Sequence, residues 1–190
     1  METRTCIKER RSMRKFTEQE VSDEQLHELL EAVRWSPSWA NTQCWEVVVI
    51  KDQARKEQLA AMLSEKNPAT KGVVQAPLVL VICARLGVAG YEHGENAEHA
   101  YATDKGDWFM FDLGIACQNI CLAAYDMGLG TVHVGHIKHK EIDQWLGLPE
   151  DVCSVEIIPV GYPAKQGKAP ARKQLEDFVH FEKYGQKRSD

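Results

Sequence analysis

The segment Arg10-Arg11-Ser12-Met13-Arg14-Lys15-Phe16 gathers three arginines, a lysine and a hydroxyl group within seven residues. Arginine presents a planar fork of donors that suits phosphate oxygens, and a serine hydroxyl can add a further hydrogen bond. These residue types predict the binding of an anionic group, with phosphate as the best match. A solvated basic segment or an arm that binds nucleic acid would contain the same residues.

Charge over the rest of the chain restricts these alternatives. The 190 residues carry a formal net charge of −5, whereas a general binder of nucleic acid or of an anionic membrane would present a broadly basic face. We therefore interpret the basic segment as a local site and expect neither a nucleic-acid nor a membrane partner. The opening Met1-Glu2-Thr3-Arg4 leads into a charged segment rather than the apolar run of a secretory signal, so we expect a cytoplasmic protein.

A second basic segment follows more than 150 positions later, Lys165-Gln166-Gly167-Lys168-Ala169-Pro170-Ala171-Arg172-Lys173. Two separated cationic segments could hold one phosphate between them. On its own, the second segment is more typical of a solvated basic tail than of a phosphate site.

Polar groups also gather in the loop Pro37-Ser38-Trp39-Ala40-Asn41-Thr42-Gln43-Cys44-Trp45. Its amide and hydroxyl groups could recognise the polar edge of a ring, although its two tryptophans are equally suited to packing or to an interface. The stretch Gly128–His136 is rich in glycine, but its first glycine ends a helix, so it does not match a dinucleotide-binding fingerprint. Its backbone could still approach a flat ligand closely.

Histidine and cysteine patterns do not indicate a metal centre. His133, His136 and His139 would not converge where a strand turns into a helix, so we expect no metal there. Six cysteines are scattered without a CxxC pair, which predicts reduced thiols in the core. Cys117 and Cys121 are one helical turn apart, and core packing accounts for both.

The elements that position these residues alternate between helices and strands in one domain, residues 1–190, of α/β or α+β class. A capping box, Ser22 with Gln25, begins a helix that ends near Trp35. We expect a surface excursion or lid at about 86–107, and a tail at about 164–190 that packs against a surface not identified by the sequence. Apolar periodicity predicts further helices at 53–64, 107–127 and 140–146, and strands at 45–50, 77–84, 131–134 and 154–160.

Five motifs in order along nearly the whole chain resemble the FMN-dependent nitroreductase family. They are Arg10-Arg11-Ser12-x-Arg14-x-Phe16; Ala32-x-x-Trp35-x-Pro37-Ser38-x-x-Asn41-x-Gln43-x-Trp45; Ala76-Pro77-Leu78; Leu122-Ala123-Ala124 with Gly128-Leu129-Gly130-Thr131; and Gly161-Tyr162-Pro163 with Arg172-Lys173. The resemblance implies an α+β fold, a three-layer α/β/α sandwich around a mixed, mostly antiparallel sheet. It also implies a homodimer with two FMN sites at its interface.

The activity implied is transfer of electrons from NADH or NADPH, through FMN, to an electrophile such as a nitroaromatic or a quinone, in alternating half-reactions. Two alternatives stay open at this point. One is specialised flavin chemistry, such as dehalogenation or flavin fragmentation, and the other is a protein that binds flavin without turnover. No side chain is expected to act as a nucleophile, because the cofactor carries the chemistry.

The resemblance also assigns roles residue by residue. Phosphate ligands are expected among Arg10, Ser12, Arg172 and Lys173, with Arg11 near the phosphate or the ribityl chain. Arg14 is expected beside the flavin pyrimidine, where a cation would favour the reduced ring. The partner subunit is expected to lay its loop over the flavin through Pro37, Ser38, Trp39 and Asn41, and the backbone at Val134 and Gly135 to contact the other face.

The chain departs from the family pattern at several positions. Cys44 stands where proline is frequent, Trp39 where a small residue is frequent, and His133 where an aromatic is frequent. We expect Trp39 to narrow access to the flavin and to favour small or planar acceptors. An amide that contacts the flavin edge is frequent before the Ala-Pro motif; here Asn67, Thr70 and Lys71 remain alternatives for that role.

Overall fold

Four strands form the middle layer of the molecule, in the spatial order β1-β2-β4-β3. The structure is a computed structural model that describes residues 1–92, 100–165 and 167–188. All three strand pairings are antiparallel, with Val48 opposite Val81 and Leu80 opposite Ile158. The expected parallel component is a single isolated bridge between Ser12 and Thr131. The strands are β1 (Trp45–Ile50), β2 (Leu78–Arg85), β3 (Gly130–Thr131) and β4 (Val152–Gly161).

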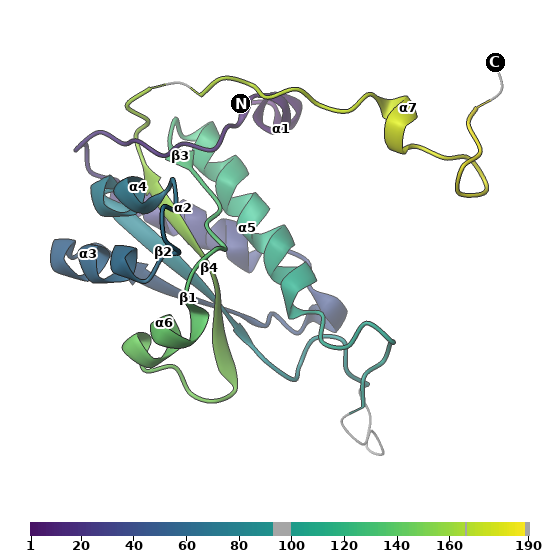
Figure 1. Cartoon of the computed structure of the whole chain (residues 1–190), viewed down its shortest axis with the longest axis horizontal. Helices are drawn as coiled ribbons and strands as arrows, with labels where there is room; N and C mark the ends of the chain where they lie inside the picture. The colour runs from purple at the N-terminus through teal and green to yellow at the C-terminus, as the bar shows by residue number, and fades with distance from the viewer. Residues whose placement is uncertain (93–99, 166, 189–190) are drawn as a thin grey trace.

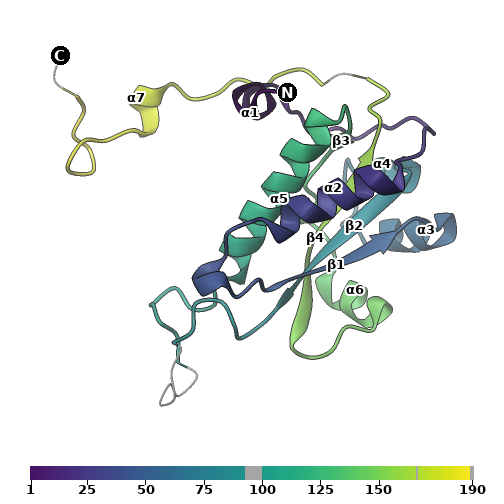
Figure 2. The same cartoon turned by 180° about the vertical axis from the view of Figure 1, so that it is seen from behind.

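Helices cover both faces of this sheet, as Figures 1 and 2 show from opposite sides. Alternate residues of β2 pack on opposite faces because successive side chains of a strand point in opposite directions. Leu80 and its neighbours pack with α2 (Asp23–Arg34) and α5 (Phe109–Asp126). Val81 and its neighbours pack with three helices on the opposite face, α3 (Gln53–Ala61), α4 (Thr70–Gln75) and α6 (His139–Leu146). This confirms the three-layer α+β sandwich.

Most predicted element boundaries agree with the structure within a few residues. The capping box of α2 is confirmed: the Ser22 hydroxyl accepts the Gln25 N–H at 3.1 Å, and Gln25 accepts the Ser22 N–H at 3.0 Å. The expected strand at 131–134 is wrong in extent, because β3 ends at Thr131. Beyond it the chain leaves the sheet edge, and Val134 returns only as an isolated bridge to Ile157.

The excursion at 86–107 lies partly outside the described residues, which omit 93–99. Its two described ends fold against each other: Ala102 N–H donates to the Gly90 carbonyl at 2.8 Å, and Tyr91 forms an antiparallel bridge with Tyr101. Trp108 N–H closes the base through the Ala89 carbonyl at 3.0 Å. The excursion is therefore anchored to the body immediately before α5.

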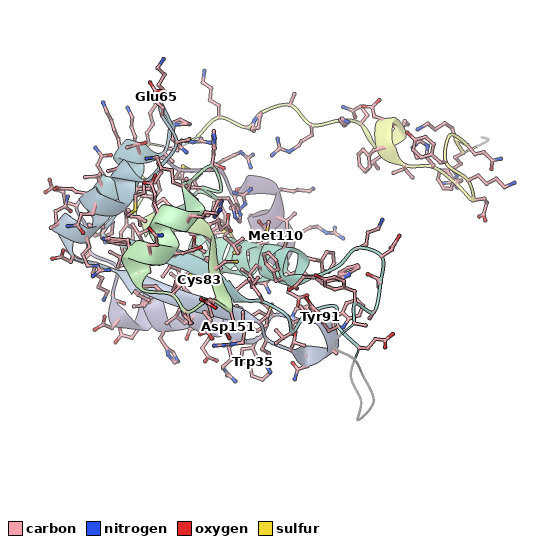
Figure 3. The ribbon with its side chains drawn as sticks, turned by 60° about the horizontal axis from the view of Figure 1, so that its bottom comes forward. Trp35, Glu65, Cys83, Tyr91, Met110 and Asp151 are labelled. Carbon is pink, nitrogen blue, oxygen red and sulfur yellow. The ribbon has the colours of Figure 1, made fainter. Side chains whose placement is uncertain are left out.

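The segment 167–188 extends away from the body, beyond α1 (Thr3–Glu9) and through the short α7 (Leu175–Phe178) (Figures 1 and 2). Figure 3 shows side chains around α7 projecting far from the layers that enclose Cys83. Phe178 is 54% exposed and Tyr184 is 93% exposed, so the surface on which we expect the tail to pack is not provided by the described part of this chain. Within the described residues, no helix combines the length and apolar character needed to cross a membrane.

Candidate functional site

The basic segment runs beside β3 at the edge of the sheet. Ser12 forms a parallel bridge with Thr131, and the Met13 N–H donates to the Thr131 carbonyl at 2.8 Å. A Cβ on Gly130 would lie 2.7 Å from Cγ of Met13, so glycine is needed for this close approach. The segment between Arg10 and Arg14 is thereby fixed by backbone contacts, which leaves its polar side chains available for a ligand.

Arg10 has the most distinctive side chain of this segment. Its Nε and Nη1 atoms are buried and have no hydrogen-bond partner in the described part of the chain, and the same is true of the Thr131 hydroxyl beside Ser12. Buried donors without partners are costly, so such groups usually meet a ligand or solvent. Arg11 differs, because its Nη1 donates to the carbonyls of Lys8 at 2.6 Å and Arg10 at 2.8 Å. The unpartnered donors of Arg10 and Thr131 are suited to an anionic group such as the phosphate of FMN.

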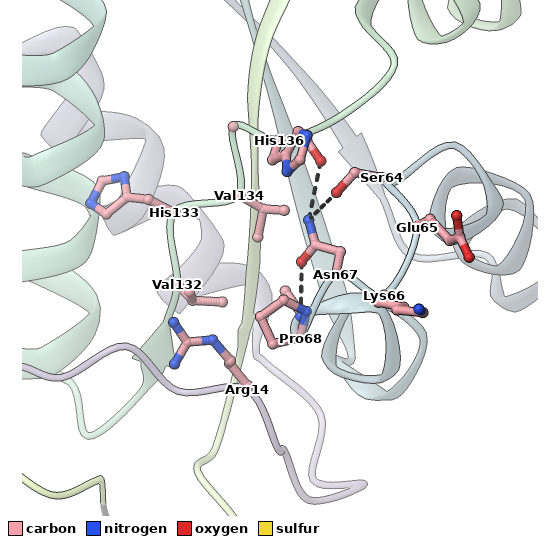
Figure 4. Close-up of a pocket in the computed structure, with 12 residues that line it drawn as sticks. Arg14, Ser64, Glu65, Lys66, Asn67, Pro68, Val132, His133, Val134 and His136 are labelled. Carbon is pink, nitrogen blue, oxygen red and sulfur yellow. Dashed lines mark hydrogen bonds between the residues drawn. The ribbon is translucent and has the colours of Figure 1, made fainter.

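An open pocket of about 280 Å³ lies beside Arg14 (Figure 4). Pockets that enclose a small organic ligand usually measure roughly 300–1,000 Å³, so one chain supplies only part of an enclosure for a flavin. Of the three candidates for an edge-contacting residue, only Asn67 lines this pocket. The remaining lining is backbone-rich and includes the predicted Val134 and Gly135; the full set is Arg14, 64–69 and 132–136.

Asn67 is held in place by its own hydrogen bonds. Its Nδ2 donates to the His136 carbonyl at 3.1 Å and to the Ser64 hydroxyl at 3.3 Å, and its Oδ1 accepts the Ala69 N–H at 3.0 Å (Figure 4). The last bond is an Asx-type turn that leads into α4. Asn67 therefore joins the 64–69 loop to the 132–136 segment across the pocket.

Gly72 of α4 lets the Arg14 backbone reach the pocket, and Gly72→Ala tests this contact. A Cβ would lie 2.8 Å from the Arg14 carbonyl oxygen and 3.1 Å from its carbonyl carbon, so backbone would have to move. We expect a destabilisation of about 1–3 kcal/mol from overpacking, together with weaker FMN binding. Thermal unfolding and FMN titration measure both. Lys71→Ala, an exposed change on the same helix, should alter neither; equal behaviour of the two variants would contradict this role.

His133 turns away from the pocket that its backbone lines. In Figure 4 its ring points to the side opposite Asn67, toward a helix. Its Nε2 lies 3.3 Å from Sγ of Cys121 on α5, and its Nδ1 lies 2.9 Å from Glu156 on β4. These partners occupy opposite edges of the imidazole and do not share a centre. The described residues contain no group of three or more potential metal ligands.

The hydrogen bonds to Cys121 and Glu156 raise the pKa of His133 to about 10, against the lowering effect of burial. Because the folded state binds this proton more tightly than the unfolded chain, the stabilisation is complete below about pH 6.5 and is lost as the pH rises through about 10. We expect the unfolding free energy of the wild type to fall more over this window than that of Glu156→Gln. Denaturant titrations at pH 6, 8 and 10 measure the difference, and parallel curves would refute the linkage.

The loop that contains Pro37, Ser38 and Trp39 lies outside this pocket. It lines a separate apolar hollow of about 320 Å³ with Phe111 and Asp112. The Trp39 ring packs on Trp108 with centroids 5.1 Å apart. Within one chain the structure therefore does not bring the loop, including the exposed Asn41, to the surface formed by Arg14, Val134 and Gly135.

Arg172 and Lys173 also lie apart, on the exposed tail. The Arg172 guanidinium donates to the carbonyls of its neighbours Pro170 and Ala171 at 3.2 and 3.3 Å. Gln166, part of the same basic segment, falls outside the described residues. The second basic segment does meet the first at Gly167, which lines a pocket with Arg11 and Met13. The hydrogen bonds of the Arg172 guanidinium in the described residues go only to its own tail, so shared phosphate binding by Arg10 and Arg172 stays a prediction.

Two residues of this region were missed by sequence reasoning. Asp112 interrupts an apolar helix and accepts the Trp39 N–H with both oxygens at 3.0 Å. Glu156 lies within β4 and orients His133. A lone carboxylate inside an apolar run is a signal for a buried polar contact. The partner of Asp112 is 73 positions away and that of Glu156 is 23 positions away, so neither could be inferred locally.

The structure thus combines an α+β sandwich with an open pocket beside a basic segment that contains buried donors without a partner in the described residues. The model of the Nitroreductase family matches residues 7–162, and the chain belongs to this family. It is 30% identical to the FMN reductase, NAD(P)H type, of Bacillus subtilis over 94% of this chain and 72% of the relative. It is also 30% identical to an NADH dehydrogenase of Thermus thermophilus, over 94% and 95% of the two chains.

A solved structure supports the same assignment. The NADPH:FMN oxidoreductase from Vibrio harveyi, complexed with NAD+, matches with a TM-score of 0.79 and 26% sequence identity. The match covers 98% of this chain and 79% of that one. The shared architecture therefore extends over nearly the whole chain, including the segments that form the pocket.

Proposed function

We propose that the protein is an FMN-dependent oxidoreductase that uses NADH or NADPH to reduce an electrophilic acceptor, such as a nitroaromatic or a quinone. The observation that carries this proposal is the pair of buried Arg10 nitrogens, Nε and Nη1, without a partner in the described residues, on the same segment as Arg14 at the open pocket. The FMN reductase of Bacillus subtilis and the flavin oxidoreductase of Vibrio harveyi support the cofactor and the donor.

Binding of FMN is assigned to both basic segments. Arg10 and Ser12 hold the phosphate with charge-assisted hydrogen bonds, and Arg172 and Lys173 add positive charge from the tail. Arg11 lies near the phosphate or the ribityl chain. When bound, FMN supplies hydride transfer from the nicotinamide and onward transfer of electrons to the acceptor.

The pocket positions the ring. Arg14 places a fixed positive charge beside the pyrimidine, where negative charge gathers on reduction, and so favours the reduced cofactor. Asn67 would meet the edge of the bound ring, and the backbone at Val134 and Gly135 would contact its face, since all three line the pocket beside Arg14. No side chain acts as a nucleophile. Because the cofactor would carry the electrons between the two substrates, the two half-reactions use the same pocket in turn.

A homodimer with two FMN sites at its interface completes the enclosure. The pocket in one chain is open, and the Pro37–Asn41 loop lies on another surface, where it is available to cover the flavin of a partner subunit. The six cysteines are free thiols, which suits a reducing compartment, and we place the protein in the cytoplasm.

Trp39 sets the acceptor range in this proposal. Trp39→Ser removes the indole that packs on Trp108 and widens the entrance. We compare kcat/KM for a bulky bicyclic acceptor with kcat/KM for a small monocyclic one. The ratio of the first to the second should rise by about tenfold, which is the lower end of the discrimination that one steric contact in a pocket provides. Steady-state assays measure the ratio. Val74→Ala, on the opposite helical layer, is the control, and an unchanged ratio in Trp39→Ser would remove this role.

The reaction order provides the kinetic test. Initial rates are measured while NADH and a quinone are varied together, and again with a nitroaromatic. Alternating half-reactions in one pocket predict parallel lines in a double-reciprocal plot. Intersecting lines would contradict a shared pocket, because they require both substrates to be bound at the same time.

A further inference from the structure

The loop between α2 and β1 has an unusual backbone. Ala40, Asn41 and Gln43 have positive φ angles of 43°, 58° and 49°. None is glycine, and residues with a Cβ adopt this left-handed region only at an energetic cost. Three such residues within four positions need surrounding contacts that hold them, and strain of this kind concentrates at functional sites.

Asp112 provides these contacts from the first turn of α5. Its carboxylate is 1% exposed, and both oxygens accept the Trp39 N–H at 3.0 Å. The Cys44 thiol donates to Oδ2 of the same carboxylate at 3.7 Å. One buried group therefore binds both ends of the loop, and the three strained residues lie between the two attachment points.

A second contact closes the loop internally. The Ser38 hydroxyl accepts the Gln43 N–H at 2.9 Å, and the Thr42 N–H donates to the Trp39 carbonyl at 2.8 Å. The Trp39 ring is held from outside by Trp108. The loop thus has one defined shape, and its exposed edge faces the apolar hollow beside Phe111, which is 60% exposed.

The surroundings of Asp112 oppose ionisation of its carboxyl group. Burial raises the pKa of Asp112 above its usual range; the hydrogen bonds from Trp39 and Cys44 oppose this shift, and Asp107 adds to it. Burial also raises the pKa of Cys44 to about 12, so the thiol remains a donor. A raised carboxyl pKa means that the folded state binds the proton more tightly, so the unfolding free energy falls as the pH rises through that pKa. Ionisation of Asp112 therefore costs the folded state more than it costs the unfolded chain.

We propose that Asp112 is a positioning residue of the flavin site: its buried carboxylate holds the Pro37–Gln43 loop in the strained shape that covers the flavin of the partner subunit. That the loop covers the flavin of a partner subunit rests on the proposed function. The attachment of the loop to Asp112 lies within one chain. Asp112 contacts neither substrate nor cofactor and acts only through the loop.

Hydrogen exchange read by mass spectrometry tests the attachment without FMN. In Asp112→Ala the amide of Trp39 loses a charged hydrogen bond, so exchange in the peptide over 37–44 should accelerate by at least about tenfold. Asp112→Asn keeps the shape and one acceptor, so its acceleration should be smaller and its melting temperature equal to or above that of the wild type. The rate of Cys44 alkylation should likewise be highest in Asp112→Ala, intermediate in Asp112→Asn and lowest in the wild type.

Asp107→Asn is the matched control. Asp107 also accepts backbone N–H groups, from Gly87 at 2.9 Å and Phe109 at 3.1 Å, but it does not contact the loop. Exchange over 37–44 should match the wild type in this variant. Unchanged exchange in Asp112→Ala, or equal acceleration in Asp107→Asn, would overturn the inference.

The dissociation rate of FMN from the loaded protein tests the destination of the loop. Loosening the loop should speed release and raise the KM for the acceptor more than it lowers kcat. Faster exchange with unchanged FMN release and KM would overturn the claim that the loop covers the flavin. Failure of the proposed function is distinguishable, because the wild type would then bind no FMN while the exchange results still stand.

Discussion

Replacing Arg10 with alanine is expected to weaken FMN binding by roughly 10- to 150-fold, which corresponds to about 1.5–3 kcal/mol for a desolvated, charged hydrogen bond. The guanidinium has two buried nitrogens without a partner, so the ligand-free protein gains nothing from them. Apo Arg10→Ala should therefore unfold at the same temperature as the wild type or higher. Loss of affinity without loss of stability is the result that identifies a ligand-binding residue.

Two further variants sharpen this test. Arg10→Lys keeps the charge but not the planar fork, and should show an intermediate affinity. Arg4→Ala removes an exposed arginine from α1 and should bind FMN normally. Fluorescence titration at fixed salt measures all four proteins. A normal affinity in Arg10→Ala would place the phosphate elsewhere.

Ending the chain at Lys173 is expected to destabilise the proposed homodimer. This change keeps the second basic segment but removes Leu175, Phe178 and Phe181, which are 66%, 54% and 43% exposed in one chain. Burying such side chains contributes about 1.5–3 kcal/mol each, or at most about 4–9 kcal/mol if a partner subunit covers all three. An obligate dimer interface buries on the order of 2,000–5,000 Å², and the tail carries four of the ten exposed large hydrophobic side chains in the described part of the chain.

Analytical sedimentation and denaturant unfolding at several protein concentrations measure this effect. We expect the shortened chain to dissociate and to unfold at lower denaturant, with a stronger dependence on concentration. Glu182→Ala, a polar change within the same tail, should behave as wild type. A shortened chain that sediments as the same dimer with unchanged unfolding would show that the tail does not stabilise the interface.

The elements were predictable where their signal is local. The apolar run of β2 and the capping box of Ser22 specify burial and a helix start within a few neighbouring residues. Helix α4 was not predicted because it has six residues and contains Gly72. Its place in the fold depends on contact with the Arg14 backbone, which lies far away in the sequence.

The candidate site was predictable only in part, for the same reason. Arg14, Val134 and Gly135 were assigned by resemblance, and the structure places them in one pocket. The choice of Asn67 required the structure: Asn67 lies in the loop before α4 and lines the pocket, whereas Thr70 and Lys71 begin the helix and do not line it. Asp112 could be recognised as a polar interruption, but the strained loop that it binds became visible only in three dimensions.

The most direct test of the central claim is anaerobic mixing of the FMN-loaded protein with NADH or NADPH, followed through the flavin absorbance band. The proposed oxidoreductase predicts rapid bleaching with at least one nicotinamide, and recovery of the band when a quinone or a nitroaromatic is added. Tight FMN binding without bleaching by either nicotinamide would contradict it, and would indicate a protein that binds flavin without this turnover.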